Sequence, residues 1–186
     1  MKLIIKKANI DYASYIAQLD MKEWYAMFSK YLPASALNTL TVSAREEITR
    51  EFMETKRWEY IIITADHKKI GFAAFGTSHD DTASMEECGE IAAIKLHPAF
   101  KKHEIFIRVL EYCTKILLES KKIIHYWVFE NDTDTLSFLK YSDFEQSGIT
   151  KNYIVGKRIF KKILFEIEVP EESELTDFDY SDDIFI

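Results

Sequence analysis

Residues 89–120 read GEIAAIKLHPAFKKHEIFIRVLEYCTKILLES and contain two structural signals in succession. The first is a run of isoleucine, alanine and leucine that stops before Pro98, which predicts a strand ending there. The second is a set of apolar residues that recur every three or four positions over about 99–120, as in a long amphipathic helix. A nearly continuous apolar run follows at 123–129 and predicts a strand buried on both faces. A long helix between two strands implies a parallel pair joined by a right-handed crossover.

The remaining segments complete a chain of alternating strands and helices. Periodicity and turn composition predict, in chain order, a strand at 3–5, a helix capped by Asp11 and running to Phe28, a helix opened by a Ser43–Glu46 capping box and ending near Lys56, a hairpin of 58–65 and 70–75, a short helix at about 133–141, and two strands within 148–169. The fold class is therefore α/β (α+β), with no internal repeat.

Composition indicates one domain with a charged extension. The chain has 186 residues, of which 47% are hydrophobic and 14% aromatic, enough for a single packed core. Seven of its 31 acidic residues lie within 170–186, a segment without Lys or Arg, and this leaves 24 acids and 24 bases in the rest. We expect a domain at 1–169 and an acidic tail at 170–186 that is either a flexible solubilising end or a docking segment.

The same composition excludes several classes of function. A formally neutral body has no clustered positive charge for nucleic acid, and no apolar run approaches the roughly 20 residues that a membrane span needs. The five histidines and two cysteines lack metal-ligand spacing, which predicts no metal site and two thiols in a reducing compartment. Because the N-terminus lacks the apolar core of a signal peptide, we expect a cytoplasmic protein.

The order of elements and several local motifs resemble the GCN5-related N-acetyltransferase (GNAT) family. Pro98, Phe100 and Lys101 occupy the positions of a proline–aromatic–basic turn after the fourth strand, and Asn131, Phe138 and Phe144 match a later segment. The resemblance covers roughly residues 1–169 and implies a mixed, mostly antiparallel central sheet of about six to seven strands flanked by about four helices. It also implies an acetyl-CoA cosubstrate, an amine acceptor on a small molecule or peptide, and assembly as a homodimer.

The resemblance assigns cofactor-binding positions around the start of the long helix. They are Leu96, Lys101, Lys102, His103, Glu104, Ile105, Phe106 and Asn131. Unpaired amides and the positive end of a helix dipole attract phosphate at such a place. The family has small residues where this chain has Glu104 and Phe106, and a carboxylate there repels a diphosphate. The pyrophosphate loop is therefore a degenerate version of the family's loop.

The resemblance also assigns catalytic positions, one of which is altered. Glu90 stands where a base would accept the proton of the acceptor ammonium, and the alternative interpretation is a solvated carboxylate at a strand end. The tyrosine that would protonate the CoA thiolate is replaced by Leu139, which cannot donate a proton. Tyr141 is the nearby candidate for that role.

Other residues have a structural and a functional interpretation. His97 is a cleft residue or a structural hydrogen-bonding residue, and His125 and Tyr126 face opposite sides of one strand without an indication of which side is the cleft. An aromatic group at Trp24, Tyr25 and Phe28 fills the core or shapes an acceptor site. Two functions remain: an acetyl-CoA-dependent N-acyltransferase, or a catalytically inactive domain of the same fold that binds or regulates a partner.

Overall fold

The computed structural model describes residues 2–37, 41–80, 84–155 and 157–168. Its strands form one seven-stranded sheet in the order β1-β2-β3-β4-β5-β7-β6. All neighbours are antiparallel except β4 and β5, which are the parallel pair expected on either side of the long helix. The strands are β1 (Leu3–Lys7), β2 (Glu59–Ala65), β3 (Lys68–Thr77), β4 (Cys88–Leu96), β5 (Ile123–Phe129), β6 (Glu145–Val155) and β7 (Arg158–Glu168).

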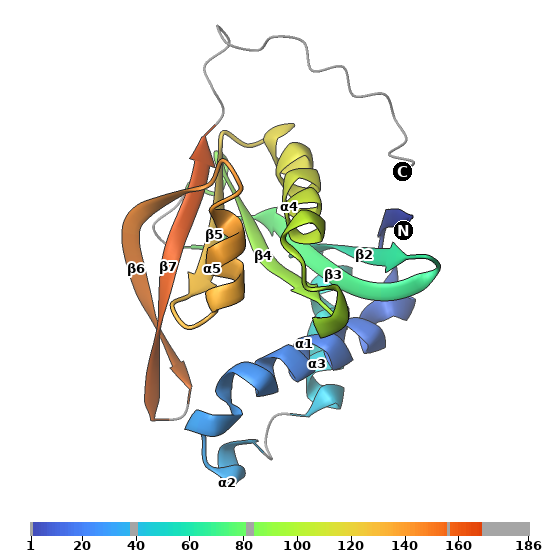
Figure 1. Ribbon diagram of the computed structural model, residues 1–186, viewed down its shortest axis with the longest axis vertical. Coiled ribbons are helices and arrows are strands. Elements are labelled where there is room, and N and C mark those ends of the chain that lie inside the picture. Colours follow the sequence, from blue (N-terminus) through green and yellow to red (C-terminus); the bar gives the residue numbers. More distant parts are fainter. Residues whose placement is uncertain (1, 38–40, 81–83, 156, 169–186) are drawn as a thin grey trace, which may run out of the picture.

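Helices cover both faces of the sheet, as the predicted order requires. Figure 1 shows α4 and α5 side by side over the middle strands, the β6–β7 ribbon at one edge, and α1 crossing toward the lower end of that ribbon. The helices are α1 (Ala13–Phe28), the one-turn α2 (Ala34–Leu37), α3 (Val42–Glu54), α4 (His103–Leu118) and α5 (Thr133–Leu139). Short 3₁₀ turns occur at Ile10–Tyr12, Ser29–Tyr31 and Pro98–Phe100.

Two apolar layers hold these helices to the sheet. The larger lies under α4 and α5 and includes Ile91, Ile94, Phe106, Val109 and Tyr126. The smaller lies under α1 and α3, around Ile16, Ile62 and Phe72. Alternate residues of β5 therefore divide between the layers, and Tyr126 faces α4 while His125 faces the α1 side.

The pairing of β4 with β5 stops halfway along both strands. Their ladder runs from Cys88 and Ile123 to Ile91 and Tyr126, after which the two strands separate. The β3–β4 register shifts at the same level, because Ala74 pairs with Ala93 while Phe75 pairs with Ile91. A bulge of this kind bends its strand, and here it bends β4 away from β5. The gap between the two middle strands therefore opens toward their carboxyl ends.

Two helix starts differ from the prediction. Asp11 was expected to cap the first helix, but α1 follows a 3₁₀ turn and its N-cap, Tyr12, makes no side-chain cap hydrogen bond. The predicted capping box at Ser43 and Glu46 is also wrong, since Thr41 is the cap of α3 and accepts a hydrogen bond from the Ala44 amide at 3.1 Å. The first error shifts the cap by one residue and the second by two, and both leave the element in place.

The two-residue turn between β2 and β3 has a local cause. Asp66 and His67 both have positive φ, 45° and 65°, the combination that a tight type I′ hairpin requires.

Within the described residues, no helix is long and apolar enough to cross a membrane. The expected acidic tail at 170–186 lies outside the described residues.

Candidate functional site

The amino-terminal end of α4 has no side-chain cap. Lys102 is the N-cap residue and its side chain makes no cap hydrogen bond. The Phe106 amide donates to the Lys102 carbonyl at 3.0 Å, so the helical ladder begins there. The three amides before it, at His103, Glu104 and Ile105, have no helical acceptor and point out of the helix end. Of the positions expected to offer backbone amides to phosphate, the structure therefore singles out these three.

Lys101 connects this end of α4 to two other helices. Its Nζ lies 3.1 Å from Asp134 of α5 and 3.6 Å from Glu23 of α1. Burial alone would lower the pKa of Lys101, but the negative charges of Asp132, Asp134 and Glu23 outweigh burial and raise it. Lys101 is thus protonated and links the start of α4 to α1 and α5. Its positive charge is balanced by the nearby carboxylates of these helices.

Two other side chains stand at the mouth of the helix. The Tyr141 ring, 67% exposed after the end of α5, stacks on His103 with centroids 4.8 Å apart. Glu104 is 64% exposed and lies 3.5 Å from the His103 ring. A carboxylate and a stacked ring pair therefore border the open amides. The structure brings together His103, Glu104 and Tyr141, and the catalytic role of Tyr141 and the cofactor-binding roles of His103 and Glu104 stay predictions.

The space between α4 and α5 is filled by aromatic side chains. Phe106 is 2% exposed, with its ring centroid 5.4 Å from that of Phe138 and 6.4 Å from that of Tyr126. Leu139, also 2% exposed, packs into the same layer. Phe106 was expected as a departure from the family's small residue, and the structure shows that its ring turns inward and joins the core.

The Tyr126 hydroxyl reaches the gap between β4 and β5. The Ile94 backbone hydrogen-bonds to it from the part of β4 that no longer pairs with β5. Burial, reinforced by the charges of Asp132 and Cys113, raises the pKa of Tyr126 despite this bond. Tyr126 is therefore a neutral phenol, and its hydroxyl oxygen accepts the hydrogen bond of the Ile94 backbone inside the opening. Leu96, expected as a cofactor contact, ends the same unpaired stretch of β4 with its side chain buried.

The opposite side of the opening carries the charged groups. We call this surface, on the α1 side of β4, β5, β6 and β7, the lysine face, and define it by Glu90, Trp127, Lys151 and Lys162. Glu90 accepts a hydrogen bond from Ser78 at 3.2 Å, and its neighbour across the ladder is His125. Glu90 thus lies next to the point where β4 and β5 separate, and its role as a base stays a prediction.

Two lysines of the lysine face stand opposite each other on β6 and β7. Lys151 lies 2.8 Å from Asp80 and 3.9 Å from the Trp127 ring centroid. Lys162 pairs with Lys151 in register and lies 4.6 Å and 5.0 Å from the ring centroids of Phe129 and Tyr153. Burial and the charges of Lys151 and Lys95 lower the pKa of Lys162 to about 8, although Glu90 opposes them.

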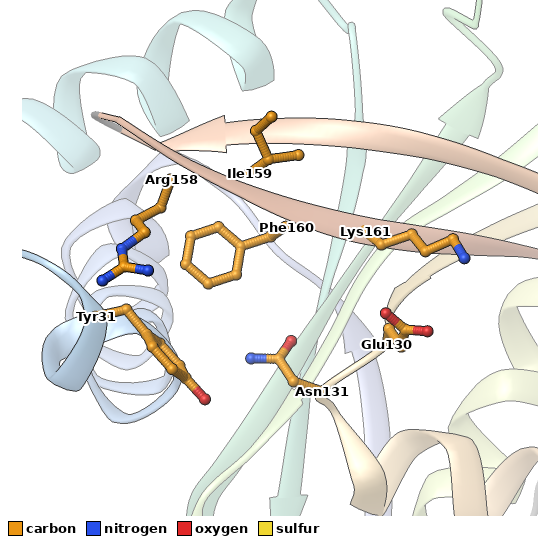
Figure 2. Close-up of a pocket in the computed structure, with 7 residues that line it drawn as sticks. All are labelled: Tyr31, Glu130, Asn131, Arg158, Ile159, Phe160 and Lys161. Carbon is orange, nitrogen blue, oxygen red and sulfur yellow. The ribbon is translucent and has the colours of Figure 1, made fainter.

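A pocket of about 320 Å³ opens beside the lysine face. Figure 2 shows the Phe160 ring at its centre, with Tyr31 and Arg158 on one side and Asn131 near the end of β5. The Phe160 ring contacts Phe28 of α1 and Tyr31, at centroid separations of 4.7 Å and 5.6 Å. Asn131, expected near the cofactor, therefore lines a pocket on the α1 side.

The structure also bears on two further open interpretations. His97 caps the 3₁₀ turn by accepting a hydrogen bond from the Ala99 amide at 3.4 Å, which is a structural role. Phe28 is buried against Phe129 and Phe160, and the centroid of the Trp24 ring lies 5.0 Å from that of Phe28, so this aromatic group packs behind Phe160, which lines the pocket. The lysines of the lysine face were not predicted. Strand alternation in β7 could group Lys162 with Phe160, but it could not say which face they share.

Comparison with known proteins found similar folds among solved structures but no match by sequence. No protein-family model matches the chain, and no curated protein matches its sequence. Among solved structures, an N-acetyltransferase from Staphylococcus aureus Mu50 superimposes with a TM-score of 0.66 at 11% identity, over 90% of this chain and 99% of that one. The PaiA N-acetyltransferase from Thermoplasma acidophilum, in complex with coenzyme A, gives 0.65 at 15% identity over 91% and 100%.

A third similar structure is the ribosomal-protein-S5-alanine acetyltransferase from Vibrio fischeri, with a TM-score of 0.63 at 13% identity over 89% of this chain and 92% of that one. Likeness at such low identity identifies architecture, and activity needs separate support. With the parallel β4–β5 pair, its opening and the crossover helix α4, the chain has the fold of the GCN5-related N-acetyltransferases.

Proposed function

We propose that the chain is an acyl-CoA-dependent N-acyltransferase that transfers an acetyl group to an amine of a small molecule or peptide. The observation that carries this proposal is the opening between β4 and β5 beside the uncapped start of α4. The helix end offers three unpaired amides to a diphosphate. The unpaired part of β4 offers further backbone donors to an extended cosubstrate, in the manner of an added strand.

The residues of the chain can perform most of the transfer. Glu90 is placed to accept one proton from the acceptor ammonium, and the freed amine attacks the thioester carbonyl carbon. A β4 amide such as that of Ile94 can donate to the carbonyl oxygen as negative charge develops there. The carbon–nitrogen bond forms, the carbon–sulfur bond breaks, the nitrogen of the new amide releases its second proton to solvent, and the thiolate takes up a proton. Because Leu139 has none to give, this last proton must come from Tyr126, Tyr141 or solvent.

The backbone around the opening offers donors to an acyl-CoA, whereas several side chains occupy the space that it would need. Phe106, Phe138 and Tyr126 fill the space between α4 and α5, and Tyr126 occupies the Ile94 donor. Glu104 adds a like charge at the phosphate end. Binding therefore requires the Tyr126 hydroxyl and at least one ring to move.

This packing favours a second candidate, an inactive domain of the same fold that binds or regulates a partner. In that case the aromatic rings between α4 and α5 are permanent core and the site for the cosubstrate is lost. Cytoplasmic location and assembly as a homodimer stay predictions under either candidate. The two candidates differ in catalysis and in affinity for CoA, and the affinity can be measured without knowledge of the acceptor.

Isothermal titration calorimetry of the purified chain with acetyl-CoA tests the proposal. We expect saturable binding in the micromolar to millimolar range, and stabilisation in a thermal melt that rises with ligand concentration. Titrations with desulfo-CoA, 3′-phosphoadenosine 5′-diphosphate and pantetheine then show how much of the binding free energy comes from the phosphate end and how much from the thiol arm of the cosubstrate. An absence of binding up to several millimolar acetyl-CoA, by a chain whose melt shows cooperative unfolding, would overturn the enzyme and support the inactive domain.

A further inference from the structure

Lys162 has no direct ion-pair partner among the described residues, and the charge of Glu90 compensates the effect of its burial only in part. Lys162 forms no ion pair or hydrogen bond with these residues, in contrast to its neighbour Lys151, which is paired with Asp80 at 2.8 Å. Its ammonium lies over the faces of Phe129 and Tyr153, at 4.6 Å and 5.0 Å from the ring centroids. Cation–π contacts of this kind compensate part of the lost hydration of an ammonium. An anion is the ligand that would supply the rest.

A second group on the same face also lacks a partner. The Trp127 Nε1 atom is buried and has no hydrogen-bond acceptor within the described part of the chain. Trp127 lies on β5 two residues before Phe129, and Phe129 pairs with Lys162, so both donors share one side of adjacent strands. His125 Nδ1, further along this side of β5, is a third buried atom without a described partner. Buried polar atoms without a hydrogen-bond partner are rare in proteins, and a missing ligand is one explanation for them.

The pocket beside the lysine face supplies room and further positive charge. It is about 320 Å³, which is the size of a small-molecule site, and its apolar wall is formed by Tyr31, Ile159 and Phe160. Arg158 and Lys161 line it against a single acid, Glu130. Phe160 pairs with Tyr153 in register, so the pocket wall continues into the aromatic contact around Lys162.

We infer that the lysine face binds the carboxylate of the acceptor, and that the acceptor is a small aromatic or apolar amine that also carries a carboxylate. Lys162 and the Trp127 indole hold the carboxylate, the apolar part enters the pocket, and the amine lies toward Glu90. The assignment of acceptor rests on the proposed acyl transfer, but carboxylate binding does not. Binding at this face can therefore be measured without acetyl-CoA.

Three compounds separate the groups that the lysine face would recognise. Phenylalanine carries a ring, an amine and a carboxylate, 3-phenylpropionate lacks the amine, and 2-phenylethylamine lacks the carboxylate. Each is titrated into the full chain while the ¹H–¹⁵N signal of the Trp127 indole is followed, with that signal assigned by the Trp127→Phe variant. We expect phenylalanine and 3-phenylpropionate to move the Trp127 signal to lower field, because its N–H gains an acceptor, and 2-phenylethylamine to leave it in place.

Substitutions then identify the charged partner. Lys162→Met is expected to weaken 3-phenylpropionate binding by roughly 10- to 100-fold, the loss typical of a hydrogen bond to a charged group. Lys68→Met, which removes an exposed lysine at the start of β3, is the matched control and should leave binding unchanged.

Four results would overturn the inference. They are an unmoved Trp127 signal with both carboxylates, an equal shift with 2-phenylethylamine, an equal shift with inorganic phosphate, and equal losses in the Lys162 and Lys68 variants. Its failure can be told apart from failure of the proposed function. Acetyl-CoA binding without carboxylate binding would reject the acceptor class alone. Carboxylate binding without acetyl-CoA binding would reject the transferase and retain the carboxylate site.

Discussion

The rings of Phe106 on α4 and Phe138 on α5 lie with their centroids 5.4 Å apart, at an interplanar angle of 48°. Phe106 is buried and Phe138 only half-buried, so the two rings close the space between the helices from its inner and outer ends. An extended cosubstrate that enters between α4 and α5 must displace this contact. The two rings therefore differ in what their removal should do.

Phe106→Ala is expected to destabilise the fold. The side chain is 2% exposed and packs on Tyr126 and Phe138, so its removal leaves a cavity in the larger apolar layer. Buried Phe→Ala changes cost about 3–5 kcal/mol of unfolding free energy. Chemical denaturation measures the loss. A loss below about 1 kcal/mol would mean that the ring is not core and that it already moves freely out of the groove.

Phe138→Ala is expected to tighten acetyl-CoA binding at a smaller cost in stability. If the ring closes the groove, only the fraction of molecules with the ring displaced can bind, and the apparent affinity falls by that fraction. Removing the ring should then improve the dissociation constant by about tenfold in a calorimetric titration. Phe52→Ala on α3 removes a half-buried ring from the other layer and serves as control. Equal affinities of wild type and both variants would contradict a closing role for Phe138.

Glu104→Gln should also strengthen acetyl-CoA binding, through charge. The carboxylate is 64% exposed in the first turn of α4, where it competes with a diphosphate for the helix end. Removing one exposed like charge should improve affinity by about two- to fivefold at low salt, and the gain should fade at high salt. Glu111→Gln, an exposed change about two turns along the same helix, is the control. An equal gain in both variants would assign the effect to net charge.

Much of the fold could be predicted because it depends on local patterns. The run 123–129 was predicted with the bounds of β5, and α4 differs from its prediction only at the ends. The caps at Asp11 and Ser43 were wrong, since several polar residues near each helix start could serve and only backbone geometry selects among them. Hydrophobic periodicity therefore predicted the elements better than it predicted their ends.

The site was predicted less well because it depends on strand pairing. Glu90 was proposed by resemblance, whereas the position of Lys162 beside Phe129 and Lys151 depends on strand register. The separation of β4 from β5 is accompanied by a bulge at Ala92. The Ala92-Ala93 sequence contains no residue that predicts a bulge. Leu139 and Phe106 could be recognised as departures, but the inward direction of their side chains came from packing.

Tyr126→Phe tests the hydroxyl within the opening. The change removes the partner of the Ile94 backbone and should cost about 1–2 kcal/mol of unfolding free energy, because a buried donor loses its acceptor. Tyr60→Phe is the control, since this buried hydroxyl makes no hydrogen bond among the described residues. Acetyl-CoA affinity of the Tyr126 variant should rise, because the Ile94 donor becomes available. Lower affinity, together with slower transfer, would instead indicate that Tyr126 contacts the cosubstrate directly.

Lys162→Met should stabilise the unliganded chain at neutral pH, and the gain should depend on pH. The folded pKa of Lys162 is about 8, lowered first by burial and then by Lys151 and Lys95 against Glu90, whereas an unfolded lysine has a pKa near 10.4. Below pH 8 the ammonium is charged in both states and the full cost of burying it is present, about 1–3 kcal/mol. Between about pH 8 and 10.4 the unfolded chain binds more protons, so wild-type stability rises with pH relative to the variant.

Thermal melts of wild type and Lys162→Met from pH 6 to 10 measure this difference. We expect the variant to melt several degrees higher at pH 7, since about 1 kcal/mol corresponds to 2–4 °C in a chain of this size. The gap should narrow steadily above pH 8, and Lys68→Met should show no such trend. Saturating 3-phenylpropionate should raise the melting temperature of wild type more than that of the variant, because a bound carboxylate offsets the cost of the buried charge. A gap that stays constant from pH 6 to 10 would mean that Lys162 is hydrated and already balanced, which would remove the physical reason for an anion at this face.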